Sequence, residues 1–322
     1  MSHQSIFLLF IGIIFFFALL PCFFRFFFLP LPNNFKRVYP KMKQAMIFAA
    51  GMGTRLKPLT DVIPKALVPV GDKPLLQIVL ERLLDAGIHN IVVNVHHKSA
   101  QICNFLKLLQ PYYDVQISVS DESEQLLETG GGIRKARGLF DAEAPILIHN
   151  VDILSNVDLG AFYDSIGDAD AMLLVSERKT KRYLLFDEEM HLVGWTNIET
   201  GEVKSPYPEI AALSGDKEKV QKMYSHSGSL PTGEGGGRGL MLAFSGIHVF
   251  SPRLFADMEQ WPEKFPIIDF YLNRCAERKI KGYLKSDLQL LDVGKLDTLA
   301  SAESMAPHLS FGHPLPKGRG KS

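Results

Sequence analysis

Between residues 44 and 176 the chain alternates short apolar runs with longer amphipathic stretches, and this alternation constrains the fold more than any other feature. Residues 44–49 (QAMIFA) are typical of a buried strand, and residues 75–86 carry apolar side chains at helical spacing up to Gly87, a helix-ending residue. Strands alternating with helices predict an α/β fold with a doubly wound, mostly parallel (Rossmann-like) sheet. Further strands are predicted at 90–95, 115–119, 145–150 and 170–176, and further helices at 99–109 and 159–166.

Ligands bind such sheets beyond the carboxyl ends of the strands. We therefore expect functional residues in the loops that follow Ala49, Val95, Val119 and Asn150. A further glycine-rich turn is predicted at 129–132, where it leads into a helix.

The second half of the chain is more mixed. It predicts a hairpin formed by 183–187 and 191–195, followed by a polar stretch at 214–239 that is rich in glycine and is expected to be a flexible insertion. The later predictions are strands at 240–250, 283–284 and 289–293, a helix at 265–278 and a final helix from Lys295. One domain over residues 42–306 with a disordered tail at 307–322 is the simplest organisation.

Residues 1–41 form an apolar extension that lies outside this domain, and ten of the 22 phenylalanines lie within residues 1–30. Residues 6–24 carry no charge, which is long enough to span a bilayer about 30 Å thick. One interpretation is a membrane anchor within residues 6–28, and the other is a mis-assigned start ahead of Met42. Both interpretations leave the following domain in the cytoplasm, because basic residues follow the apolar run.

The charge balance and the cysteines exclude several classes of protein. Lysine plus arginine and aspartate plus glutamate number 35 each, so the formal net charge is zero and a nucleic-acid partner is not expected. The three cysteines, Cys22, Cys103 and Cys275, are far apart, which argues against a disulfide or zinc framework and for a reducing compartment.

The loop after the first strand, Ala49-Ala50-Gly51-Met52-Gly53-Thr54-Arg55, contains a G-x-G pattern. It is not a dinucleotide fingerprint, because Leu56 occupies the third glycine position, and no GK[ST] closes a P-loop. The alternatives are an ordinary tight turn and a nest of backbone N–H groups around a polyphosphate. Arg55 and Lys65 beside the glycines favour the nest, because two cations can stabilise charge on a leaving pyrophosphate.

The stretch MIFAAGMGTRLKPLTDVIPKALVPVGDKPLL resembles the amino-terminal signature of the sugar-1-phosphate nucleotidyltransferases, also called NDP-sugar pyrophosphorylases. The segment LETGGGI at 127–133 is most similar to the branch that contains N-acetylmuramate α-1-phosphate uridylyltransferase, with mannose- and heptose-1-phosphate guanylyltransferases close by. The segments FSGI at 244–247 and DVG at 292–294 resemble the later motifs of the family.

The resemblance implies the fold of the nucleotide-diphospho-sugar transferases, with a small β-rich portion that binds the sugar. It also implies an Mg²⁺-dependent reaction in which an NTP and a sugar 1-phosphate give an NDP-sugar and pyrophosphate. The favoured pair is UTP with N-acetylmuramate 1-phosphate, and the alternative pair is GTP with mannose- or heptose-1-phosphate. A non-catalytic module that binds sugar nucleotides is the alternative class.

By the same resemblance, residues take roles according to the motif in which they stand. Arg55 and Lys65 are the expected catalytic residues, and Asp152 and Asp292 are the expected metal ligands. The expected nucleotide-binding residues are Ala50, Gly51, Gly53, Thr54 and Gly130, the last beside the base, and the expected sugar-binding residues are Glu128, Asn150 and Gly246.

The sequence departs from the family pattern in two respects. Val151 stands before Asp152 where relatives more often have glycine, and a β-branched residue does not readily adopt a positive φ. A Glu-x-Lys-Pro-type motif of the sugar site has no clean match, and residues 202–206 (EVKSP) resemble it only in part.

Overall fold

The computed structural model describes residues 42–225, 239–294 and 296–305. The predicted extension at 1–41, residues 226–238 of the predicted insertion and the predicted tail at 307–322 lie outside the described residues. No helix within the described ranges is both long and apolar enough to cross a membrane.

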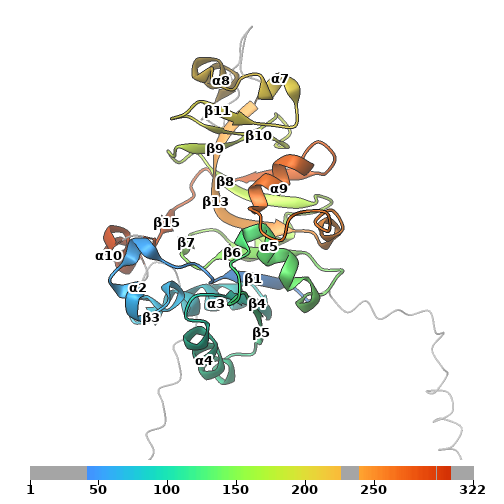
Figure 1. Cartoon of the computed structure of the whole chain (residues 1–322). Coiled ribbons are helices and arrows are strands. Elements are labelled where there is room, and N and C mark those ends of the chain that lie inside the picture. The colour runs from blue at the N-terminus through green and yellow to red at the C-terminus, as the bar shows by residue number, and fades with distance from the viewer. Residues whose placement is uncertain (1–41, 226–238, 295, 306–322) are drawn as a thin grey trace, which may run out of the picture. The chain divides into compact units, whose positions relative to one another are not determined.

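Four parallel strands form the centre of the main sheet, in the order β5-β4-β1-β6 (Figure 1). They are β1 (Gln44–Phe48), β4 (Asn90–Val95), β5 (Gln116–Asp121) and β6 (Ile146–Asn150). The long strand β13 (Gly239–Phe250) continues the sheet antiparallel to β6. The predicted largely parallel α/β sheet is confirmed, and its order reverses between β1 and β6.

Helices cover both faces of these strands because successive strand residues point to opposite sides. Ala45 and Ile47 of β1 belong to one buried cluster, together with α3 (Leu75–Asp85) and α4 (Ser99–Leu109). Met46 belongs to the cluster on the opposite face, which contains residues of α5 and α9. Strands β1, β4 and β6 are therefore buried on both faces, as expected for a doubly wound sheet, whereas β5 at the edge is partly exposed.

A second group of antiparallel strands extends from β13. It consists of β9 (Arg182–Phe186), β10 (Leu192–Asn197) and β11 (Glu202–Lys204), and β8 (Ala171–Ser176) also pairs with β13. Figure 1 shows β9, β10 and β11 with α7 and α8 at one end, and β4 and β5 with α3 and α4 at the other. The predicted hairpin is present as β9 and β10.

The remaining elements are short. In chain order they are α2 (Leu59–Val62), β2 (Pro69–Val70), β3 (Lys73–Pro74), α5 (Glu128–Lys135), β7 (Ile153–Ser155), α6 (Leu159–Asp164), α7 (Pro208–Ala211), α8 (Lys217–Met223), β12 (Tyr224–Ser225), α9 (Ile267–Arg274), β14 (Ile280–Leu284), β15 (Leu290–Asp292) and α10 (Leu296–Met305). Single 3₁₀ turns lie at Thr54–Leu56, Lys65–Leu67, Gln110–Tyr112, Ala136–Leu139 and Pro252–Phe255.

The predicted glycine turn at 129–132 is wrong, because these residues lie inside helix α5. A Cβ on Gly130 would lie 2.2 Å from Phe265 Cε2, and a Cβ on Gly131 would lie 2.4 Å from the Glu263 carbonyl oxygen. The glycines therefore allow the helix to contact the 263–265 segment closely, a long-range reason that local propensity does not reveal.

Two other boundaries differ from the prediction. The stretch at 214–225 holds α8, whose first turn is capped where Asp216 Oδ1 accepts a hydrogen bond from Lys219 N at 3.0 Å. The predicted helix at 265–278 begins later and ends earlier, as α9, with Pro266 at its N-cap.

Burial of His248 on β13 predicts a pH dependence of stability. Neither ring nitrogen has a hydrogen-bond partner within the described chain, and burial lowers the pKa of His248 to about 3. Below an unfolded pKa of about 6.5 the unfolded chain binds a proton that the folded chain does not, so stability falls as pH falls. We expect His248→Phe to reduce this slope by about 1.4 kcal/mol per pH unit between about pH 6 and pH 4.

Urea unfolding at several pH values measures the slope, and the half-exposed His89 supplies a matched control as His89→Phe. An unchanged slope in His248→Phe, or an equal reduction in the control, would contradict the prediction.

Candidate functional site

A cavity of about 210 Å³ lies where the strand order reverses, beyond the carboxyl ends of β1 and β6. Phe48 and Asn150 are paired at those ends, so the loops that follow the two strands lie side by side. We call this the switch-point cavity, and it is the position at which doubly wound sheets bind ligands. Its lining residues are Phe48, Ala50, Gly51, Lys65, Asn94, Glu122, Leu126, Glu128, Thr129, Asn150, Val151 and Asp152.

The two glycines of the loop after β1 have different surroundings. Gly51 lines the cavity, and a Cβ on it would meet nothing within 4 Å. Gly53 has φ +61°, and a Cβ on it would lie 2.8 Å from Thr60 Cγ2 and 2.9 Å from Lys65 Cβ. Gly53 therefore allows Lys65 to approach the loop, and the exposed Thr54 starts the 3₁₀ turn that follows.

Lys65 and Asp152 form an ion pair at the wall of the switch-point cavity, although 87 positions separate them in the chain. Their side chains are only 11% and 19% exposed. An ion pair this far from solvent is electrostatically strong, because little water screens it.

Asp152 follows β6 through Val151, whose N–H donates to the Phe48 carbonyl oxygen at 3.1 Å. Val151 is not among the residues with positive φ and is buried, so the turn forms without glycine at this position. The departure from the family pattern at Val151 therefore does not prevent Asp152 from lining the cavity.

Asp292 lies next to this pair because β15 is antiparallel to β7, with Asp292 opposite Ile153. Val293 N donates to the Asp152 carbonyl oxygen at 2.8 Å. Arg55 Nη2 lies 3.9 Å from Asp292 Oδ2, and both side chains are about half exposed. Two cation–carboxylate pairs therefore lie at adjacent positions, and the second pair stands outside the lining of the cavity.

Of the residues predicted to bind the sugar and the base, the structure places some at the cavity and others away from it. Glu128, at φ +60°, and Asn150 line the cavity, and a Cβ on Gly246 would lie 2.6 Å from Asn150 Nδ2. Gly130 differs from the prediction, because it faces Phe265 and does not line the cavity. Among the glycines of α5, Gly132 faces a residue that lines the cavity, since a Cβ on it would lie 2.8 Å from Glu122 Oε1.

Glu122 was not singled out from the sequence. It is fully buried, accepts hydrogen bonds from Asn94 Nδ2 at 2.8 Å and from Leu127 N at 3.1 Å, and lines the cavity. Asn94 Oδ1 in turn accepts from Ala49 N at 2.7 Å, which ties this acid to the loop after β1. The available signal was an acidic residue just beyond the carboxyl end of a predicted strand.

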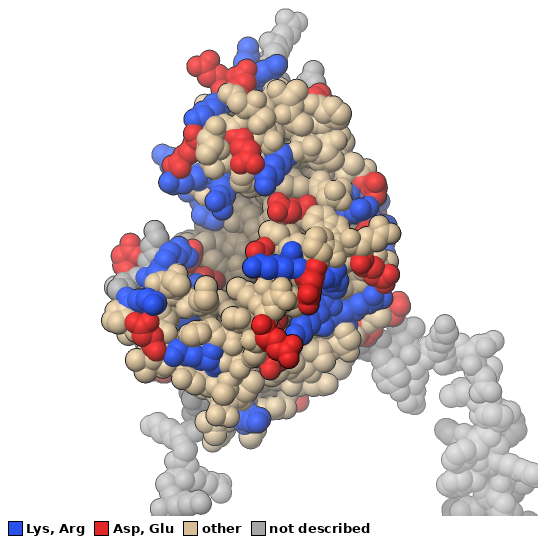
Figure 2. Space-filling view, viewed as in Figure 1, with Lys and Arg blue, Asp and Glu red and all other residues tan. Residues whose placement is uncertain are grey.

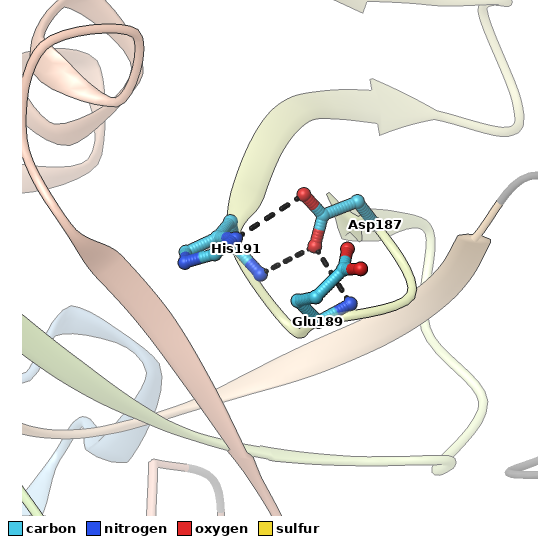
Figure 3. A group of neighbouring side chains, drawn as sticks. All are labelled: Asp187, Glu189 and His191. Atoms are coloured by element: carbon cyan, nitrogen blue, oxygen red, sulfur yellow. Dashed lines mark hydrogen bonds and ion pairs between the residues drawn. The ribbon is translucent and has the colours of Figure 1, made fainter.

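A separate group of Asp187, Glu189 and His191 lies on the β9–β10 hairpin (Figure 3). Asp187 Oδ1 accepts from Glu189 N at 3.1 Å and from His191 N at 2.7 Å. These bonds stabilise the hairpin turn, and none of the three residues lines the switch-point cavity.

The surroundings of the two glycines predict unequal effects of a single methyl group. We expect Gly53→Ala to lower the free energy of unfolding by about 1–3 kcal/mol, because the methyl group meets Thr60 and Lys65 at a positive φ. Gly51→Ala, with open space around it, is the matched control and should change stability by less than about 1 kcal/mol. Equal effects in denaturant titrations would show that Gly53 is not constrained in this way.

A sequence family described as nucleotidyl transferase matches residues 44–183, which hold β1, Arg55, Lys65 and Asp152. The N-acetylmuramate alpha-1-phosphate uridylyltransferase of Caulobacter vibrioides is 41% identical over 39% of this chain and 52% of its own length. The enzyme of the same name from Neisseria meningitidis serogroup B is 29% identical over 82% of this chain and 98% of its own length. The mannose-1-phosphate guanyltransferase of Schizosaccharomyces pombe is 32% identical over 44% of this chain and 39% of its own length.

The chain thus spans about half of the Caulobacter relative and nearly all of the Neisseria relative. Among solved structures, HddC from Yersinia pseudotuberculosis in complex with GMP-PN shares the fold, with a TM-score of 0.58 at 20% identity over 82% of this chain and 100% of that chain. These comparisons show that residues 44–183 match the nucleotidyl transferase family model and that the chain is similar to the uridylyltransferases and the guanyltransferase named above.

Proposed function

We propose that this chain transfers a uridylyl group from UTP to N-acetylmuramate 1-phosphate, giving the UDP-sugar and pyrophosphate. The observation that carries the proposal is the Lys65–Asp152 ion pair in the wall of a cavity that the loop after β1 also lines. The choice of substrates rests on the two relatives named as N-acetylmuramate alpha-1-phosphate uridylyltransferases. GTP with mannose 1-phosphate is the competing pair, since the Schizosaccharomyces pombe relative carries that name.

The reaction needs no covalent enzyme intermediate. A phosphate oxygen of the sugar 1-phosphate attacks the α-phosphorus of UTP, a P–O bond forms, the bond to the β-phosphate bridging oxygen breaks, and pyrophosphate leaves with that electron pair. Catalysis therefore consists of positioning the two substrates and stabilising charge. Gly51 and Gly53 present backbone N–H groups to the triphosphate, with Ala50 and Thr54 beside them.

The two cations have separate roles in this proposal. Lys65 holds the attacking phosphate and the α-phosphate together, because its ammonium lies at the cavity wall between the loops after β1 and β6. Arg55 stabilises the departing pyrophosphate from the more exposed side. Glu128 and Asn150 contact the sugar, with Gly246 providing space beside Asn150.

Asp152 and Asp292 are the residues that would hold Mg²⁺. They fit the ion, because carboxylate oxygens are its preferred protein ligands and one or two carboxylates with substrate phosphates suffice. Strand pairing brings the two carboxylate-bearing segments together, and each carboxylate is balanced in the described structure by a cationic side chain. When bound, Mg²⁺ would neutralise charge on the phosphate oxygens.

We further propose that residues 42–306 act as one domain in the cytoplasm. Cys103 and Cys275 are free thiols, which is typical of a reducing compartment. The nucleoside triphosphate substrate is also available there.

A pyrophosphate-release assay with the full chain tests the function. The purified protein is incubated with Mg²⁺ and each of UTP, GTP, dTTP, CTP and ATP, crossed with N-acetylmuramate, mannose, heptose, glucose and N-acetylglucosamine 1-phosphates. The proposal expects the highest rate for UTP with N-acetylmuramate 1-phosphate. A preference for GTP with mannose 1-phosphate would overturn the assigned substrates, and silence in every well would overturn the activity.

Removing one carboxylate tests the proposed metal position. We expect Asp152→Asn to lower kcat by at least about 100-fold, because it removes both a metal ligand and the partner of Lys65. Asp164→Asn is the matched control, since Asp164 pairs with Lys43 and its side chain is 64% exposed. Steady-state kinetics over a range of Mg²⁺ concentrations measure the effect, and full activity of Asp152→Asn would contradict the assignment.

A further inference from the structure

A second and larger cavity, of about 540 Å³, lies against the extension of the sheet formed by β9, β10 and β11. We call it the basic cavity. Its lining includes Arg178, Arg182, Trp195, Glu202, Lys204 and Phe244. None of the site residues expected from the sequence is among them, although Glu202 and Lys204 belong to the segment 202–206 that resembles the sugar-site motif in part.

Strand register explains why polar side chains gather on this wall. Arg182 is opposite Asn197, Asn197 is opposite Glu202, and Trp195 is opposite Lys204. Directly opposed residues share one face of a sheet, so these side chains project together. The opposite face is apolar and is buried against α7 and α8, as Leu185 and Val203 show.

The charges in the basic cavity are unevenly distributed. Lys204 Nζ lies 3.8 Å from Glu202 Oε1 and 3.8 Å from Asp269 Oδ1, so both acids of the lining lie beside the lysine. Arg182 has no hydrogen bond or ion pair from its side chain within the described ranges, and Arg178 donates only to the Phe244 carbonyl oxygen at 2.9 Å. Positive charge therefore remains unbalanced at the two arginines.

The basic cavity borders the switch-point cavity at two places. Phe244 lines the first, and Gly246, two residues further along β13, contacts Asn150 of the second. Two residues of a strand span about 7 Å, so the cavities adjoin. On the other border, Ile267 N donates to Thr129 Oγ1 at 2.9 Å, which joins the 266–269 segment to helix α5.

Figure 2 shows the corresponding face of the molecule. A hollow opens between the part that carries β9, β10 and β11 and the part that carries α2, and basic side chains lie on both sides of it. A sugar whose anomeric phosphate is held at Lys65 can therefore extend toward the basic cavity.

We infer that Arg178 and Arg182 bind a carboxylate carried by the sugar of the substrate and so select an acidic sugar 1-phosphate over its neutral counterpart. The inference rests on the proposed function, because N-acetylmuramate differs from N-acetylglucosamine by a lactyl ether that ends in a carboxylate. Guanidinium groups suit this task, since they bind carboxylates through two parallel hydrogen bonds and stay charged at all relevant pH values. Trp195 and Phe244 supply the apolar wall beside them.

The test compares two substrates that differ only in the lactyl group. With UTP, the parent protein should use N-acetylmuramate 1-phosphate at least 10-fold better in kcat/KM than N-acetylglucosamine 1-phosphate. Arg182→Gln should lower kcat/KM for the acidic sugar by about 10- to 100-fold, mainly through KM, because one charge-assisted hydrogen-bonding group is lost. The same variant should leave kcat/KM for the neutral sugar within about twofold.

Lys181→Gln is the matched control for charge. Lys181 is the neighbouring residue in the chain, pairs with Glu199 at 2.8 Å and does not line the basic cavity, so both substrates should be unaffected. Arg178→Gln should repeat the selective loss. Because both arginines are exposed, thermal unfolding should show little change in these variants.

Three outcomes would overturn the inference while the proposed function stands. They are equal rates of the parent on the two sugars, equal losses on both sugars in Arg182→Gln, and an unchanged preference in both arginine variants. Absence of turnover with every sugar would instead overturn the proposed function. In that case, calorimetry with free N-acetylmuramate and free N-acetylglucosamine tests the inference separately. The inference requires that the parent protein bind N-acetylmuramate more tightly than N-acetylglucosamine, and that Arg182→Gln bind the two sugars equally.

Discussion

The pairing of β1 with β4 on one side and β6 on the other is the constraint on which the rest of the structure depends. Residues 146–150 must lie parallel to residues 44–48, about 100 positions earlier, and only a crossover through the intervening strands and helices allows this. Because the strand order reverses here, the loops after β1 and β6 share one crevice. Lys65 and Asp152, one from each loop, form their ion pair there.

Strand β13 links this crevice to the rest of the site. Its register against β8 shifts between Phe244 and His248, so the strand carries an irregularity next to Gly246. Irregularities of this kind bend a strand and change the direction of its side chains. Residues 240–242 of β13 therefore pair with β9 and residues 247–250 pair with β6. Between these two parts, Phe244 lines the basic cavity and Gly246 lies against Asn150 of the switch-point cavity.

The sequence was most informative where the pattern is local. The strands at β1, β4 and β6 and the helices α3 and α4 follow directly from apolar periodicity, and the loop residues Lys65 and Asp152 follow from their motifs. The glycines of α5 were misassigned because they are required by contact with 263–265, over 130 residues away. Arg182 carries no spacing signal and Lys204 only the partial motif at 202–206, since strand pairing places both residues on one wall.

The two cavities differ in how their charge is balanced, and this difference bears on selectivity. Lys65 in the switch-point cavity lies beside Asp152, and Arg55 outside its lining lies beside Asp292. Because each cation has a carboxylate partner, this region offers little net attraction to an anion that arrives without a cation. Polyphosphates arrive with divalent cations and can exchange partners with both pairs. Arg182 has no such carboxylate in the described residues, so a single carboxylate can bind it without displacing another anion. In the proposed reaction, discrimination between sugars therefore arises at the basic cavity and the transfer of the nucleotidyl group at the switch point.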